Sequence, residues 1–130
     1  MNDLARLEGF KIPRHIAAAQ ASSMLGHALL HHYCDASQTA YAVKTYVRLG
    51  HYNGYVHISL FGACARNAPI KTTSIPRLEL CATTLAARVD TKINQGMTLI
   101  LEDSVFWSDS MIVLQYISST RQRFHTFVTN

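Results

Sequence analysis

Three short runs between Ala28 and Ala65 constrain the fold of this chain more than any other feature. The runs ALLHHYCDAS, AYAVKTYVRL and YVHISLFGACA are rich in β-branched and aromatic residues, and turn-forming residues separate them. Successive strands joined by short turns form an antiparallel meander. Alternation within the first run predicts two faces, with Leu30, His32 and Cys34 on one and Leu29, His31, Tyr33 and Asp35 on the other.

A long helix is predicted after the three strand runs, in KTTSIPRLELCATTLAARVDTKINQG. Thr73 or Ser74 can cap it, Pro76 suits its first turn, and Gly96 suits a position just past its end. Apolar residues spaced by three and four predict one buried stripe, made of Leu78, Cys81, Leu85, Val89 and Ile93.

The segment MTLILEDSVFWSDS then predicts either a pair of strands or one strand entered through a loop. A second helix follows, with Asp109 or Ser110 near its start. Phe106, Trp107 and Tyr116 are expected in or near the core. The order of three strands, a helix, a strand and a helix predicts an α/β fold with a mixed sheet.

The length of 130 residues leaves room for one domain. We expect residues 1–27 to form a connector or leader and residues 28–130 to form the domain. Charged residues make up only 15% of the chain, against about 25% in typical soluble domains, which suggests a surface that missing chain or a partner covers. The net charge of +4 suits a polyanion such as nucleic acid. The absence of a signal peptide or a membrane-length apolar segment favours an intracellular protein.

Three acidic residues stand at predicted element boundaries. Asp35 ends an apolar strand, Glu79 lies in the first turn of the long helix, and Asp109 ends the run VFWSD. Singly, they fit a turn residue, a dipole-stabilised carboxylate and a helix cap. Together, in this element order, they can converge on one point above the sheet. Clustered carboxylates repel and need cations, and oxygen ligands select Mg²⁺ or Mn²⁺. Two such ions would hold the attacking water and the leaving oxygen of a phosphodiester.

Four segments, YCDASQTAYAVKTYVRL, SIPRLELCATTLAAR, VFWSDSMIVLQYI and RFHTFVTN, resemble the ribonuclease H region of BEL/Pao retrotransposon polyproteins. The run IPRH resembles the stretch that joins reverse transcriptase to that region. The resemblance implies a ribonuclease H-like fold and hydrolysis of RNA in RNA–DNA hybrids. It places Asp35, Glu79 and Asp109 on the first three of four metal-binding carboxylates. It also implies the rest of a reverse transcriptase polyprotein as partner, and the cytoplasm or a virus-like particle as location.

The chain also departs from that pattern. No acidic residue follows Asp109, so we expect the domain to be incomplete at its C-terminus and inactive as it stands. Lys44 and Thr45 occupy strand positions that are usually apolar or small in these polyproteins. Four further residues could contact the substrate: Ser110, Arg66, Lys71 and Arg77.

Three other interpretations compete with this one. A catalytically dead relic, or a connection-like module that binds nucleic acid, would keep the fold without the reaction. An aspartic peptidase fragment is suggested by the name Pao retrotransposon peptidase, which similar sequences carry, but no Asp-Thr-Gly or Asp-Ser-Gly motif is present. A zinc site at His27, His31, His32 and Cys34 is disfavoured, because alternation separates His31 from His32 and Cys34.

Overall fold

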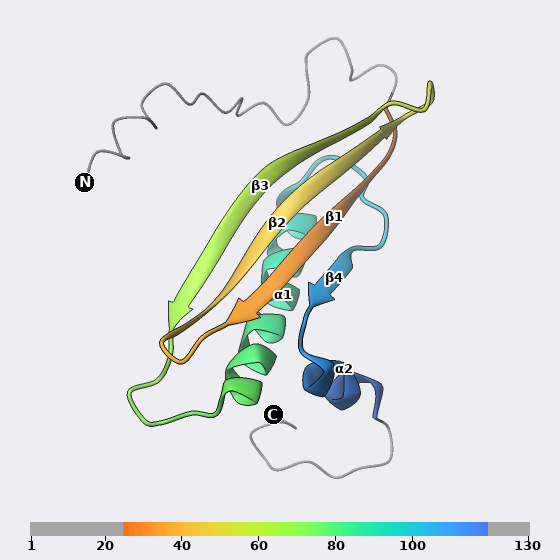
Figure 1. Ribbon diagram of the computed structural model, residues 1–130. Helices are drawn as coiled ribbons and strands as arrows, with labels where there is room; N and C mark the ends of the chain where they lie inside the picture. Colours follow the sequence, from red (N-terminus) through yellow and green to blue (C-terminus); the bar gives the residue numbers. More distant parts are fainter. Residues whose placement is uncertain (1–24, 120–130) are drawn as a thin grey trace, which may run out of the picture.

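The computed structural model describes residues 25–119, which form a mixed sheet with two helices (Figure 1). The elements in chain order are β1 (Leu25–Ala36), β2 (Ala40–His51), β3 (Val56–Asn67), α1 (Ile75–Gly96), β4 (Val105–Ser108) and α2 (Met111–Ser118). The sheet is four-stranded with the order β3-β2-β1-β4. The first three strands are antiparallel neighbours, and β4 runs parallel to β1. The predicted α/β class and mixed sheet are confirmed.

The meander follows from two tight turns between three long strands. At the first turn, the Ser37 amide donates to the carbonyl of Ala40 at 2.7 Å. At the second, Gly54 adopts a φ of 86°, which is easily reached only without a Cβ atom. The expected leader lies outside the described residues except for its last three positions, which belong to β1 because that strand begins at Leu25.

Helix α1 covers one face of the sheet and contacts β1 and β2 (Figure 1). Its N-cap is Ser74, and Pro76 lies in the first turn as predicted. The predicted stripe is only partly right, because the fully buried residues are Leu78, Ala82 and Ala86. Alanine side chains let the helix axis approach the sheet closely. The larger apolar residues Cys81, Leu85, Val89 and Ile93 therefore flank the contact and are only partly buried.

The core lies between α1 and the sheet. One cluster joins Ala28, Leu30, Val47 and Leu49, and a second joins Cys34, Val43, Ala82 and Ala86. Leu30, His32 and Cys34 are buried toward α1, whereas Tyr33 and Asp35 are exposed, so the predicted alternation in β1 is confirmed.

Residues 97–104 form no strand, so β4 is a single strand entered through a loop, which was one of the two predicted alternatives. Phe106 and Trp107, expected in or near the core, are 43% and 49% exposed, although the Phe106 ring stacks on the fully buried His32. β4 is only four residues long, and α1 covers a single face of the sheet. Within residues 25–119, no helix is long and apolar enough to span a membrane.

The close contact of α1 with the sheet is tested by enlarging one alanine. Ala82→Leu adds three carbons where the side chain is 0% exposed, so it should lower the free energy of unfolding by about 1–3 kcal/mol through overpacking. Ala87→Leu makes the same change on the exposed side of the helix and should alter it by less than about 0.5 kcal/mol. Urea unfolding of both variants measures the difference, and equal effects would contradict the packing described.

Candidate active site

Asp35 and Asp109 come together at the ends of two neighbouring parallel strands. Asp35 is the penultimate residue of β1, and Asp109 directly follows β4. The parallel register pairs Cys34 with Ser108, so each aspartate is one residue beyond a paired position. Both line one surface cavity of about 330 Å³ together with Tyr33, Cys34, Trp107 and Ser108. The structure thus brings two of the three predicted carboxylates to one place.

Both aspartates are exposed at this cavity. The Oδ1 atom of Asp35 accepts a hydrogen bond from the amide of Ala36 at 2.8 Å, which fixes the orientation of the carboxylate. Carboxylate oxygens can accept further bonds from water, a metal or a substrate group. Two exposed carboxylates on adjacent strands therefore provide hard oxygen ligands suited to Mg²⁺ or Mn²⁺.

Glu79 lies at the same end of the sheet but outside the cavity lining. Ala82, about one turn later on α1, packs in one cluster with Cys34, the residue before Asp35. The sequence placed Glu79 in the first helical turn. That placement is wrong, because the helix begins at Ile75 and its first turn contains no acidic residue. Glu79 is in the second turn and half-buried. Across residues 25–119, no group of three or more His, Cys, Asp or Glu side chains is arranged to hold a metal. The joint role of the three carboxylates stays a prediction.

The four predicted substrate-side residues occupy different settings. Ser110 is 7% exposed and caps α2, with its Oγ atom accepting from the amide of Val113 at 3.3 Å. Lys71 is exposed in the segment that joins β3 to α1, and Arg77 lies in the first turn of α1. Arg66 is exposed near the end of β3.

Two aromatic rings form a wall of the aspartate cavity. Tyr33 and Trp107 stack with ring centroids 5.9 Å apart and an interplanar angle of 7°. The indole Nε1 of Trp107 donates to Nδ1 of His31 at 3.0 Å, which requires the neutral imidazole. Burial lowers the pKa of His31, and Arg48 and His32 lower it further, so this acceptor is available at neutral pH.

Cys34 lines the same cavity as a neutral thiol. Burial raises the pKa of the Cys34 thiol to about 11. A thiolate is the form that acts as a nucleophile or binds metal. At neutral pH, Cys34 therefore acts as a packing residue at the base of the cavity.

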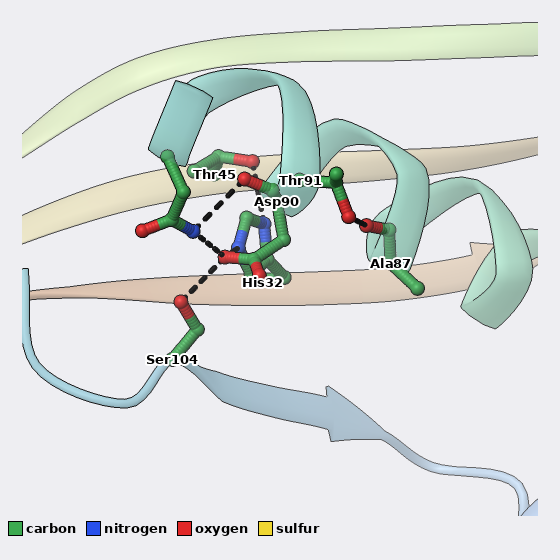
Figure 2. Close-up of polar contacts among 7 residues, drawn as sticks. His32, Thr45, Ala87, Asp90, Thr91 and Ser104 are labelled. Carbon is green, nitrogen blue, oxygen red and sulfur yellow. Dashed lines mark hydrogen bonds and ion pairs between the residues drawn. The ribbon is translucent and has the colours of Figure 1, made fainter. Parts of the chain in front are cut away.

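A polar network around the buried His32, which the sequence pattern did not reveal, joins α1 to β1 and β2 (Figure 2). His32 is 0% exposed. Its Nε2 donates to Oδ1 of Asp90 at 3.0 Å, since a carboxylate can only accept. Its Nδ1 forms a hydrogen bond of 2.9 Å with the hydroxyl of Thr45. A histidine and an aspartate 58 positions apart give no local signal. The one sequence signal for this network was Thr45, a polar residue at a strand position that is usually apolar or small in the polyproteins that the chain resembles.

The same Asp90 oxygen accepts two more hydrogen bonds, from Nδ2 of Asn94 and from the hydroxyl of Ser104. Ser104 directly precedes β4, so the network joins β1, β2, α1 and the entry to β4. Fixing Ser104 against α1 fixes the position of β4 along β1. Asp109, five residues later, is thereby positioned beside Asp35.

The energetic role of the network is tested by removing its shared acceptor. Asp90→Ala leaves the buried imidazole of His32 without its partner at Nε2, which should cost about 1–3 kcal/mol of unfolding free energy. Asp103→Ala removes an equal charge from an exposed loop position and should change stability by less than about 0.5 kcal/mol. Chemical denaturation compares the two variants, and a loss no larger for Asp90→Ala would contradict this role.

Comparison with known proteins agrees with this architecture. The family described as the Pao retrotransposon-like RNaseH-like domain matches residues 1–110. Searches of curated proteins and of solved structures gave no significant match. The matched span includes Asp35, Glu79 and Asp109, and covers the sheet, α1 and β4. The chain therefore belongs to the family of Pao retrotransposon-like RNaseH-like domains.

Proposed function

We propose that this domain acts in a retrotransposon polyprotein as a metal-dependent ribonuclease H, which hydrolyses the RNA strand of RNA–DNA hybrids. The observation that carries the proposal is the convergence of Asp35 and Asp109 on one cavity at the ends of parallel strands. Glu79 lies about one turn before Ala82 on α1, and Ala82 packs against Cys34, the neighbour of Asp35. Membership of the RNaseH-like family supports the same reaction class.

The donor set fits a hard divalent cation. Asp35 and Asp109 offer exposed carboxylate oxygens at the cavity, and Glu79 would supply a third. Bound Mg²⁺ or Mn²⁺ ions would activate water and stabilise the leaving oxygen of the phosphodiester. Ionised carboxylates repel one another without a cation between them, so the two aspartates of the cavity favour a bound cation.

The chain's own residues would position the substrate around this centre. Asp35 is held in one orientation by the amide of Ala36, and the Asp90 network holds β4, and with it Asp109, in register. Trp107 and Tyr33 present exposed rings beside the carboxylates, where a base or sugar could stack. Lys71, Arg66 and Arg77 would contact phosphates at this end of the sheet, whereas Ser110 would act mainly by positioning the start of α2.

The alternative function is nucleic-acid binding without hydrolysis. Residues 110–130 contain no Asp or Glu, so they add no fourth carboxylate to the site. Two-metal hydrolysis depends on stabilising both the entering and the leaving oxygen. A chain with three carboxylates could hold one ion firmly and still bind a hybrid, which is the behaviour expected of a connection-like module.

Metal binding is expected to stabilise the fold. Adding Mg²⁺ or Mn²⁺ should raise the melting temperature, because a ligand that binds only the folded state shifts the equilibrium toward it. Asp35→Asn should raise the melting temperature without metal, by relieving repulsion, and should reduce the shift that metal produces. Thermal melts with and without each ion check both effects. Asp103→Asn, which makes the same charge change away from the cavity, is the control, and identical behaviour of both variants would argue against a shared carboxylate site.

Hydrolysis is tested with a labelled RNA–DNA hybrid and Mg²⁺. Residues 1–130 should give no detectable cleavage, because loss of one ion should slow two-metal hydrolysis by several orders of magnitude. The chain extended by any coding sequence that follows Asn130 should cleave, and Glu79→Gln in that chain should abolish cleavage. Cleavage by residues 1–130 that Glu79→Gln abolishes would show that a fourth carboxylate is dispensable. Failure of the extended chain to cleave would favour the binding module.

A further inference from the structure

A second cavity, of about 480 Å³, lies on the covered side of the sheet between α1 and strands β2 and β3. Its lining combines residues of β2, β3 and α1, and three of these are cationic: Arg66, Arg88 and Lys92. We call this cavity the basic groove. None of its lining residues is acidic. The aspartate cavity and the basic groove share no lining residue.

The three cations of the basic groove are available to an external anion. All three side chains are exposed. Within residues 25–119, none of the three forms an ion pair with a carboxylate. The ion pair between His32 and Asp90 belongs to the polar network around His32 and involves none of these cations. The positive charge of the basic groove is therefore not neutralised within the described part of the protein.

The arrangement of these cations suits a chain of phosphates. Arg88 and Lys92 are four residues apart on α1, so they lie on one face of the helix and about 6 Å apart along its axis. That distance is close to the rise of two nucleotides along a duplex strand, about 7 Å. Tyr41, whose hydroxyl can also contact a phosphate, lines the groove between the helix and Arg66.

Strand register connects the basic groove to the candidate active site. Arg66 pairs with Tyr41, and Tyr41 pairs with Ala36, the neighbour of Asp35. Two strand spacings, about 10 Å, separate Arg66 from β1 at this level. A nucleic-acid strand that follows the groove from Lys92 past Arg88 to Arg66 would arrive at the end of the sheet that carries the aspartates.

We propose that the basic groove binds the phosphate backbone of the RNA–DNA hybrid away from the scissile bond. This inference rests on the proposed function for the identity of the substrate, but not on hydrolysis. The competing surface is the uncovered sheet face, where a cavity of about 430 Å³ is lined by His31, Tyr33, Lys44, Tyr46, Arg48 and Ile58. That surface is less suited to a backbone, because a guanidinium nitrogen of Arg48 is already bonded to His27 at 3.0 Å.

Single charge removals on the two faces discriminate between these surfaces. Arg66→Gln, Arg88→Gln and Lys92→Gln each remove one cation from the basic groove, and Lys44→Gln removes one from the uncovered face. All four side chains are exposed, and thermal melts confirm that each variant folds. Fluorescence anisotropy of a labelled RNA–DNA hybrid then gives the affinity of the 130-residue chain over a range of salt concentrations. EDTA in the buffer keeps hydrolysis out of the measurement.

Each groove variant should bind several-fold more weakly at low salt. Each should also reduce the slope of log K against log salt by about 0.9 for every phosphate that the variant no longer neutralises. Lys44→Gln should leave the slope unchanged. The proposal is overturned if Lys44→Gln lowers the slope as much as Arg88→Gln does. It is also overturned if the wild-type chain fails to bind the hybrid at low salt, or if poly-glutamate at equal charge concentration displaces the hybrid. If the groove variants bind weakly and the chain extended beyond Asn130 also fails to cleave, the result supports the basic groove and counts against the ribonuclease proposal alone.

Discussion

The acceptor oxygen of Asp90 is the point on which the rest of this structure depends. It accepts hydrogen bonds from the imidazole of His32 on β1, the side-chain amide of Asn94 on α1 and the hydroxyl of Ser104, which directly precedes β4. Hydrophobic packing alone would allow a strand of four residues to slide along its neighbour, since it offers little side-chain area to set the register. Three directional bonds to one partly buried carboxylate remove that freedom. A polar contact beside the core thereby determines where two surface aspartates meet.

The elements of the fold could be predicted because their signals are local. Turn residues, the Pro76 position and two-residue alternation each depend on a few neighbouring side chains, and each was confirmed. The buried face of α1 was predicted only in part, because the prediction selected the most hydrophobic residues at helical spacing. The close contact between the helix and the sheet instead buries the small residues Ala82 and Ala86. The exposure of Trp107 depends on which face of the sheet the helices cover, and the composition of the chain does not indicate which face that is.

The candidate site divides in the same way. Asp35 and Asp109 were predicted to converge because each was expected at the end of a strand, and the parallel pairing of β1 with β4 brings these two ends together. The network of His32, Thr45 and Asp90 could not be found, since its members come from three elements and have no shared motif. The basic groove likewise depends on the packing distance between α1 and β3.

The position of β3 in the sheet has a consequence for how this domain associates. β3 is twelve residues long and pairs only with β2 among the described strands, so it forms one edge of the described sheet. Exposed Ile58, Leu60 and Phe61 accompany this edge, and such strands act as templates for strands of other molecules. β4, at the opposite edge, is too short to offer the same template. Of the two edges of the described sheet, only the β3 edge is therefore long enough to pair with a further strand along many residues.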